Sequence, residues 1–260
     1  MTMVSRRIGR LLGLSFAICH LSFSVAQAQP STLFDEQSGK AERNVQRSTF
    51  NVQRSTSEWR DSLAVLNKAI TANPQSTDLR LKKAAVNIEL QQWDYAIEEY
   101  GRVLTIDAKS LPALYYRAYA HNHLRHYDMA RADYERFLQL LPRHFEARMG
   151  LAMTKRLQGK KLEASEELNR LVEMFPDSAV AYAVRADFEQ EQAQYDLALY
   201  DWDEALRLAP NRQDFQLGRY GVLWAMRRYD EARRLGQQLL AGGVPNATLK
   251  QLQVDPRIKK

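Results

Sequence analysis

The sequence predicts an all-α protein built from repeated antiparallel helix pairs, and three periodic features carry this prediction. A box of an aromatic residue, Asp, any residue and Ala appears four times, and its small position recurs every 34 residues. A second small residue stands twelve positions before most of these sites, and Pro, which breaks helices, stands twelve positions after four of the six. The small position of the box falls at Ser62, Ala96, Ala130, Ala164, Ala198 and Ala232.

The first 28 residues have the features of a signal peptide. Three arginines precede an apolar stretch over residues 11–25, and Ala26-Gln27-Ala28 has the small-x-small form that signal peptidases cleave. The stretch is about 15 residues long, whereas a membrane-spanning helix needs about 20. We therefore expect cleavage after Ala28 and a periplasmic or secreted protein. Retention of this segment as a membrane anchor is the alternative.

Removal of the signal peptide changes the chemistry that the chain can offer. Cys19 is the only cysteine, so the mature chain would have no disulfide, no thiolate nucleophile and no cysteine metal site. The formal charge of the whole chain is +6, and loss of the three signal-peptide arginines leaves 34 basic against 31 acidic residues, a net +3. No cofactor motif is present, and we expect none to bind.

Residues 29–56 are polar and contain a tandem duplication, in which residues 44–50 are followed by a near copy at 51–57. This composition predicts a flexible linker, with a docking segment as the alternative. One helix over about 57–71 is expected next, before five complete helix pairs. A short capping segment is expected near 247–253.

Each of the two helices in a pair is expected to carry one small residue, which lets the helices approach closely. Ala84, Ala118, Ala152 and Ala186 fill this role on the first helices. The Asp of each box suits an N-cap of the second helix, and the aromatic before it can pack across the turn. Four and seven positions after the small residue comes an apolar stripe that predicts the core. It consists of Tyr100, Val103, Tyr134, Phe137, Leu168, Leu171, Trp202 and Ala205.

These positions resemble the tetratricopeptide repeat family, whose units have a small residue at position 8, an aromatic near 17, Ala at 20, a large apolar residue at 24 and Pro at 32. The resemblance implies a right-handed superhelical solenoid of antiparallel helix pairs. In the last unit, Tyr220 at position 8 and Gly236 at position 24 depart from the pattern, as expected of a terminal repeat. The units are a partial one at 57–76, then 77–110, 111–144, 145–178, 179–212 and 213–246, with a capping segment and tail at 247–260.

By this resemblance, the first helices line a concave groove that binds a partner peptide or helix. Tyrosine and methionine side chains make the middle of the groove apolar and adaptable. Packing on the neighbouring helix is the alternative role for each apolar residue of the groove. The predicted lining is Leu81, Ile88, Tyr115, Tyr119, Asn122, His123, Met149, Met153, Arg156, Asp187, Gln190 and Trp224.

The best-known binding chemistry of this family is a clamp on the C-terminal carboxylate of a partner. The clamp requires Lys at position 5 and Asn at position 9 of one unit. None of the five complete units has that pair, so we do not expect the protein to bind chaperone tails in this way.

Positive charge is concentrated in residues 111–161, which contain ten Lys or Arg against four acidic residues. Such a basic patch would attract an anionic lipid surface, a cell-wall polymer or an acidic protein, and an ordinary solvated face is the alternative. No nucleic-acid motif is present. The patch comprises Arg117, Arg125, Arg131, Arg136, Arg143, Arg148, Lys155, Lys160 and Lys161.

All histidines of the mature chain lie in one unit, at His121, His123, His126 and His144. His121 is expected in the core and His144 at the far end of the next helix, so we predict no metal site. Adjacent acids such as Glu98-Glu99, Glu166-Glu167 and Asp203-Glu204 diverge on a helix and are expected to be surface charge, so we predict no catalytic residues. The sequence therefore predicts an exported protein-interaction scaffold. A lipid- or polymer-binding module is the second hypothesis, and zinc-dependent catalysis is the third.

Overall fold

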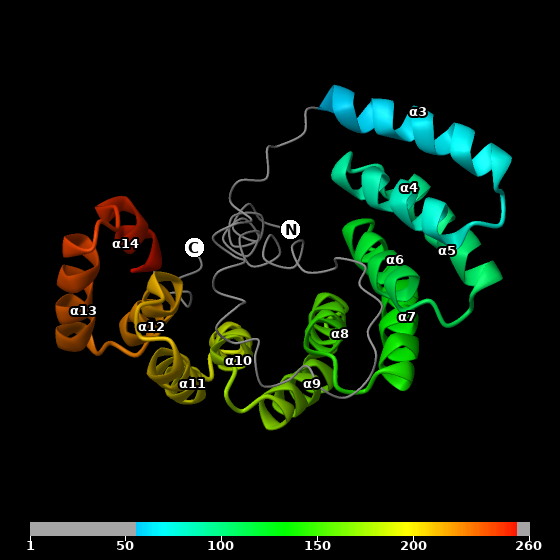
Figure 1. Cartoon of the computed structure of the whole chain (residues 1–260). Coiled ribbons are helices and arrows are strands. Elements are labelled where there is room, and N and C mark those ends of the chain that lie inside the picture. Colours follow the sequence, from blue (N-terminus) through cyan, green and yellow to red (C-terminus); the bar gives the residue numbers. More distant parts are fainter. Residues whose placement is uncertain (1–55, 254–260) are drawn as a thin grey trace. The chain divides into compact units, whose positions relative to one another are not determined.

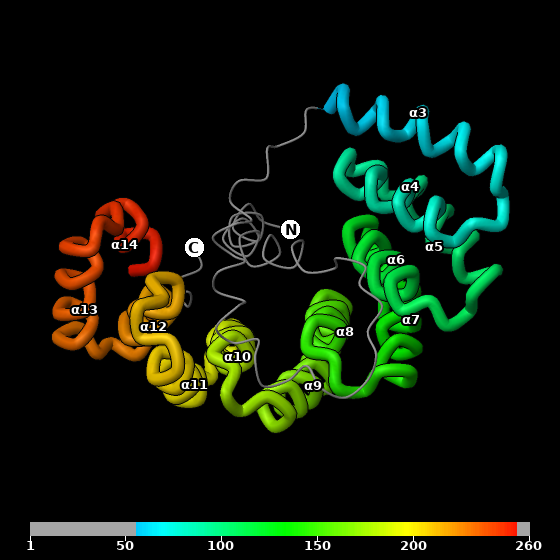
Figure 2. Tube along the Cα trace, viewed as in Figure 1, coloured from blue at the N-terminus to red at the C-terminus, as the bar shows by residue number. Residues whose placement is uncertain are grey.

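The structure, a computed structural model, describes residues 56–253 (Figure 1, Figure 2). Within this range the chain forms twelve α-helices and no strand, which confirms the predicted all-α fold. The predicted signal peptide, all but the last residue of the predicted linker, and residues 254–260 lie outside it. The chain divides into two compact units, residues 1–65 and 66–260, and the packing described below belongs to the second.

The described part begins with α3 (Thr56–Ala72), which extends the expected lone helix by one residue at each end. Ten helices then alternate as first and second members of five pairs. The first helices are α4 (Thr77–Glu89), α6 (Leu111–His123), α8 (Phe145–Leu157), α10 (Ala179–Glu191) and α12 (Gln213–Ala225). The second helices are α5 (Trp93–Ile106), α7 (Tyr127–Leu140), α9 (Lys161–Met174), α11 (Tyr195–Leu208) and α13 (Tyr229–Ala241), and α14 (Asn246–Leu252) closes the series.

From α4 to α13, each helix packs against the next one along the chain. First helices also contact one another directly, α4 with α6, α6 with α8 and α10 with α12, while α14 packs on α12. Figure 1 shows the first helices together on one side of this stack and the second helices on the other. One side of the stack is therefore formed by the first helices.

The predicted core is confirmed. The alanines of the register, on first helices from Ala84 to Ala186 and on second helices from Ala96 to Ala232, are all 0% exposed. Every member of the predicted apolar stripe is buried as well. Burial of one large apolar side chain stabilises the fold by about 1.5–3 kcal/mol. Packing within and between pairs is therefore a large source of stability for the stack.

The first helix of every pair ends in the same turn. The residue after the C-cap has a left-handed backbone, and the next backbone N–H donates back into the helix, as Gln194 does to the carbonyl of Glu189 at 2.9 Å. This turn reverses the chain into the second helix. Only one of the five left-handed residues is glycine. They are Gln91 (φ 56°), Arg125 (62°), Gly159 (77°), Ala193 (59°) and Arg227 (62°).

The predicted N-cap role of the box Asp is wrong. The aromatic Trp93 is the first residue of α5, Gln92 is its N-cap, and Asp94 already lies in the first turn. The same offset holds for α7, α11 and α13. The left-handed turn places the N-cap of each of these helices two residues before the Asp. These carboxylates still stabilise the helix there, because they lie near the positive end of its dipole.

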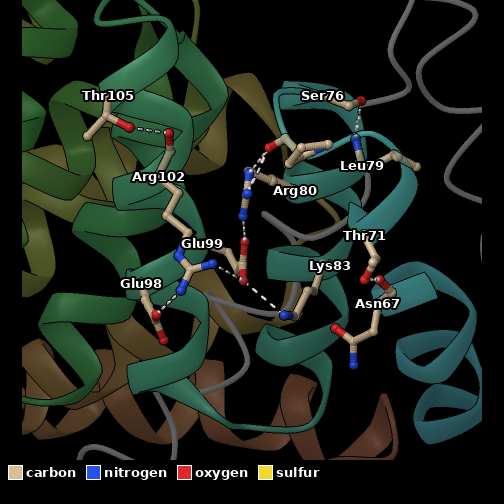
Figure 3. Close-up of polar contacts among 11 residues, drawn as sticks. Asn67, Thr71, Ser76, Leu79, Arg80, Lys83, Glu98, Glu99, Arg102 and Thr105 are labelled. Atoms are coloured by element: carbon tan, nitrogen blue, oxygen red, sulfur yellow. Dashed lines mark hydrogen bonds and ion pairs between the residues drawn. The ribbon is translucent and has the colours of Figure 1, made fainter. Parts of the chain in front are cut away.

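A buried ion pair joins the two helices of the first pair (Figure 3). Glu99 of α5 accepts from Arg80 Nη1 and from Lys83 Nζ of α4, each at 2.9 Å. Burial alone would raise the pKa of Glu99, but hydrogen bonds from Lys83 and Arg80 outweigh it and lower this pKa. Glu99 is 3% exposed, so its prediction as surface charge is wrong.

The same acidic position recurs in the next three pairs and always meets an arginine of the first helix. Arg117 Nη2 lies 2.6 Å from Asp133, Arg148 Nη1 lies 2.7 Å from Glu167, and Arg185 Nε lies 2.6 Å from Asp201. The arginine is the fourth residue of α4 and α8, but the seventh of α6 and α10. The arginine that pairs with the buried carboxylate therefore alternates between two positions of the first helix from one pair to the next.

Candidate partner-binding face

The predicted groove residues all belong to first helices. Ile88 is only 5% exposed and belongs to a core cluster, so its prediction as groove lining is wrong. The others are half-buried, except His123, which is exposed. We define the first-helix face as Leu81, Tyr115, Tyr119, Asn122, His123, Met149, Met153, Arg156, Asp187, Gln190 and Trp224.

A stack of rings forms the first-helix face around the end of α6. The ring of His123 stacks on Trp93 at 3.9 Å with an interplanar angle of 5°. Tyr119 meets both rings edge-on, at 4.6 Å from His123 and 6.0 Å from Trp93. Trp93, the first residue of α5, thus packs on α6, the first helix of the next pair. His123 is part of an aromatic surface rather than of a histidine cluster.

Tyr115 is more firmly held by the protein itself. Its ring meets Tyr134 edge-on at 5.8 Å, Phe137 at 6.0 Å and Tyr116 at 5.1 Å. Tyr134 and Phe137 are buried, so one side of Tyr115 rests on the core. For this residue, packing on neighbouring helices accounts for much of its apolar surface.

Asn122 joins two neighbouring first helices. Its Nδ2 donates to Thr154 Oγ1 of α8 at 2.8 Å, and Thr154 also donates to the carbonyl of Gly150 at 2.7 Å. Thr154 is fully buried. Asn122 therefore has a structural partner and orients α6 against α8.

Arg156 bridges α8 and α10 through two carboxylates. Its guanidinium lies 3.4 Å from Asp187 Oδ2 and pairs with Glu191, and it also approaches Met153 Sδ at 3.6 Å. Burial raises the pKa of Asp187 and that of Glu191, although Arg156 opposes both shifts. Glu191 belongs to this site but is absent from the predicted lining, although it is the thirteenth residue of its helix, as His123 is of α6.

At the C-terminal end of the face, Trp224 packs against other aromatic rings. Its ring centroid lies 4.8 Å from that of Tyr229 and 6.3 Å from that of Tyr220. Its indole Nε1 is buried and has no hydrogen-bond partner among the described residues. Trp224 is half-buried and combines core packing with a surface edge.

The basic patch is corrected at two positions. Arg148 and Lys155 are 7% and 8% exposed, and both contact the buried Glu167, Lys155 at 3.2 Å. Glu167 itself was predicted as surface charge, which is also wrong. These cations lie inside the third pair, because a buried carboxylate must be compensated. They offer no charge to a partner.

Other members of the basic patch have partners too. Arg117 pairs with Asp133, and Lys160 lies 3.4 Å from Glu163. Arg136 donates to the carbonyl of Ala108, Arg143 donates to that of Met174, and Arg131 lies 3.5 Å from Asp128. Arg125 and Lys161 are exposed. The patch therefore presents less positive charge than the sequence predicts.

The histidines do not converge. His121 is 6% exposed, as predicted for a core residue, and burial lowers its pKa. His144 caps α8 by accepting from the N–H of Ala147 at 3.2 Å. Within residues 56–253, no three His, Cys, Asp or Glu side chains are grouped so that they could hold a metal ion. None of the helices in that same range has the length and apolar character needed to cross a membrane.

Sequence comparisons match segments of the chain. Residues 115–179 match the family model described as tetratricopeptide repeat. The peptidyl-prolyl cis-trans isomerase FKBP4 of Bos taurus is 32% identical over 88 residues, which are 34% of this chain and 19% of that protein. The small glutamine-rich tetratricopeptide repeat-containing protein 2 of Saccharomyces cerevisiae is 30% identical over 131 residues, 48% of this chain and 36% of that protein. The chain thus spans well under half the length of either relative.

Solved structures share the fold over more of the chain. Pseudomonas aeruginosa pilF superposes with a TM-score of 0.61 and 18% identity, covering 83% of this chain and 94% of that one. A tetratricopeptide repeat protein from Parabacteroides merdae gives 0.57 at 18% identity, covering 83% and 89%. YrrB, described as having an unusual peptide-binding site, gives 0.51 at 17% identity, covering 74% and 94%.

These findings agree with the 34-residue register and with the alanines buried in every pair. The family model matches the middle of the chain, and the fold that the solved structures share extends over most of its length. The chain therefore has the fold of tetratricopeptide repeat proteins, and its residues 115–179 match the family model itself.

Proposed function

We propose that this protein is an exported adaptor that binds a peptide or helix of a protein partner on its first-helix face. Tetratricopeptide repeat proteins are protein–protein interaction scaffolds, and their fold is generally not enzymatic. The observation that carries the proposal is the half-buried state of Tyr119, Met149 and Met153 in the middle of this face.

Side chains of this kind suit a binding surface. Met149 and Met153 pack against a core cluster on one side, and Tyr119 does so against another, yet each keeps some exposure. A side chain already held by its own protein loses less conformational entropy when a partner covers it. Thioethers and aromatic rings also adapt to varied apolar surfaces. YrrB, which shares the fold, is described as binding a peptide.

Recovery of partners from the native envelope tests this proposal. The double variant Tyr119→Ala, Met153→Ala should lose partners that the wild-type protein retains, as identified by mass spectrometry. Tyr95→Ala, Met129→Ala is the matched control, since these side chains are 62% and 60% exposed on second helices. Circular dichroism should show equal helicity for all three proteins. Equal partner recovery by both variants would contradict the proposal.

Export is the second part of the proposal and rests on the basic start, the short apolar stretch and the small-x-small sequence ending at Ala28. The mature protein should begin at Gln29 and be found outside the cytoplasm. N-terminal sequencing of the protein from fractionated cells measures both. An uncleaved chain in the cytoplasmic fraction would refute export and leave the binding proposal intact.

The alternative function is binding of an anionic lipid or a cell-wall polymer through the basic patch. It loses support because Arg148 and Lys155 are buried against Glu167, and because other members of the patch have acidic or carbonyl partners. The alternative would regain support if the mature protein bound anionic vesicles and this binding weakened as salt was added.

A further inference from the structure

We propose that the segment bound on the first-helix face is cationic as well as apolar. Its Lys or Arg side chains would pair with Asp187 and Glu191, next to apolar side chains packed on Tyr119 and Met153. This inference rests on the proposed function and defines the chemistry of the partner.

The apolar and acidic parts of the face lie in one row. Tyr119, Met153 and Asp187 are each the ninth residue of successive first helices, α6, α8 and α10. α6 packs directly on α8, and Arg156 of α8 approaches both Met153 Sδ at 3.6 Å and Asp187 Oδ2 at 3.4 Å. The apolar and acidic side chains are thus linked through one guanidinium. One short segment can therefore contact both parts.

At the acidic end of the row, formed by Asp187 and Glu191, negative charge exceeds positive charge. Arg156 is the guanidinium that contacts both Asp187 and Glu191, whose side chains are 34% and 35% exposed. The three groups together carry a net charge of −1. Burial raises the pKa of both carboxyl groups even with Arg156 in place, so their charge is incompletely compensated. A further cation would be attracted to these carboxylates.

The remaining charges on this side of the stack favour the same partner. Positions 2, 5, 9, 12 and 13 of the five first helices include every residue of the first-helix face; among them Arg156 is the one Lys or Arg, and six residues are Asp or Glu. Lys82 and Arg212 offset two of the six, Asp78 and Asp214, at the rim. The acidic residues are Asp78, Glu89, Glu146, Asp187, Glu191 and Asp214.

The arginines of the first helices do not cancel this charge. Arg117, Arg148 and Arg185 pair with acids of the second helices instead, as described above. The partner-facing side of the molecule is thus acidic, although the chain as a whole is basic. Complementarity of charge selects a cationic segment over an acidic one.

Three fluorescent synthetic peptides of equal length test the inference, with alternating Leu and Lys, Leu and Glu, or Leu and Ser. Fluorescence anisotropy with the mature protein measures their affinities. The Leu/Lys peptide should bind at least about tenfold more tightly than the other two. Equal or tighter binding of the Leu/Glu peptide would overturn the inference. So would the absence of saturable binding of the Leu/Lys peptide up to about 1 mM.

Two variants locate the charge effect. Asp187→Asn, Glu191→Gln should weaken Leu/Lys binding about tenfold, whereas the control Glu166→Gln, Glu173→Gln, on the exposed side of α9, should not. Arg156→Gln should strengthen it, because it removes the cation that offsets the two carboxylates. A gain in affinity cannot come from misfolding. Unchanged affinity in the acidic double variant would overturn the inference.

Failure of the inference can be told from failure of the proposed function. If Tyr119→Ala, Met153→Ala weakens binding of every peptide while the charge variants change nothing, the face binds partners without selecting cations. If that variant leaves all affinities unchanged, the face is not the binding site, and both proposals fail.

Discussion

At Ala193 the backbone has a φ of 59°, a conformation in which a Cβ is crowded by the neighbouring carbonyl. Glycine adopts this conformation without that cost, although it adds entropy to the unfolded chain. Ala193→Gly should therefore raise the free energy of unfolding by about 0.5–1 kcal/mol. Urea denaturation measures this. Gly159→Ala, at the equivalent turn with a φ of 77°, should lower stability, and a loss of stability in Ala193→Gly would contradict this explanation.

Glu189 is a buried acid whose charge should make stability depend on pH. Burial raises its pKa from 4.5 to about 7, the Asp201 carboxylate adds to the rise, and Arg185 opposes it. The folded state thus holds this proton more tightly than the unfolded state. The stabilisation is present below pH 4.5 and is lost as the pH rises through about 7.

Glu189→Gln keeps the site neutral and should remove this loss. The variant should be more stable than the wild-type protein at pH 8, on the order of 2 kcal/mol, and nearly equal to it at pH 4.5. Urea denaturation at the two pH values provides the comparison. Glu166→Gln, on the exposed surface of α9, serves as the control and should show no such difference. An equal effect of Glu189→Gln at both pH values would show that the charge of Glu189 is not responsible.

At the scale of residues, the sequence predicts burial correctly for side chains whose position in the 34-residue repeat determines their environment, such as Ala84 and Tyr134. It cannot predict which carboxylates are buried, since Glu98 and Glu99 look alike in sequence, yet only Glu99 is reached by Arg80 and Lys83. The environment of Glu99 depends on residues 16 and 19 positions away. Side-chain pairing across helices is the missing information.

At the scale of elements, α11 and α12 come closest at a glycine. A Cβ added to Gly218 would lie 2.3 Å from the ring of Trp202, which is 6% exposed and cannot move freely. Helix propensity favours Ala over Gly by about 1 kcal/mol, but overpacking of a core costs about 1–3 kcal/mol. Gly218→Ala should therefore lower the melting temperature.

A matched substitution separates the two effects. At Gly101 of α5, an added Cβ would meet only Arg117 Nη1 at 3.8 Å, an ordinary contact. Gly101→Ala should leave stability equal or raise it, and thermal melts followed by circular dichroism compare the two variants. If Gly218→Ala were as stable as Gly101→Ala, the close packing of Trp202 on α12 would not explain the stability of the Gly218→Ala variant.

The 34-residue period also predicts the positions of the helices well, because each repeat of the sequence forms one helix pair. α4, α6, α8, α10 and α12 begin at the residues where the repeat units were expected to start. The N-caps of the second helices were misplaced, since a turn with a left-handed residue is not visible in a pattern where only Gly159 among five is glycine. Non-glycine residues in this conformation leave no signal in the sequence.

For the whole molecule, the central feature is the acidic and aromatic character of the first-helix face. The expected basic patch counted cations without their partners. Arg117 and Arg148 pair with acids across a helix pair, and Arg136 and Arg143 donate to backbone carbonyls. The first-helix face could be predicted from the family resemblance, but its acidic character depends on which side of each helix the cations occupy. That information is three-dimensional.

Photo-crosslinking in the native envelope tests most directly whether the first-helix face binds the partner. A benzophenone amino acid replaces Tyr119 on this face, or Tyr200 on α11, which is 61% exposed on a second helix. Binding through the first-helix face predicts a crosslinked product of defined mass from position 119 and none from position 200. Crosslinking from position 200 alone would contradict it.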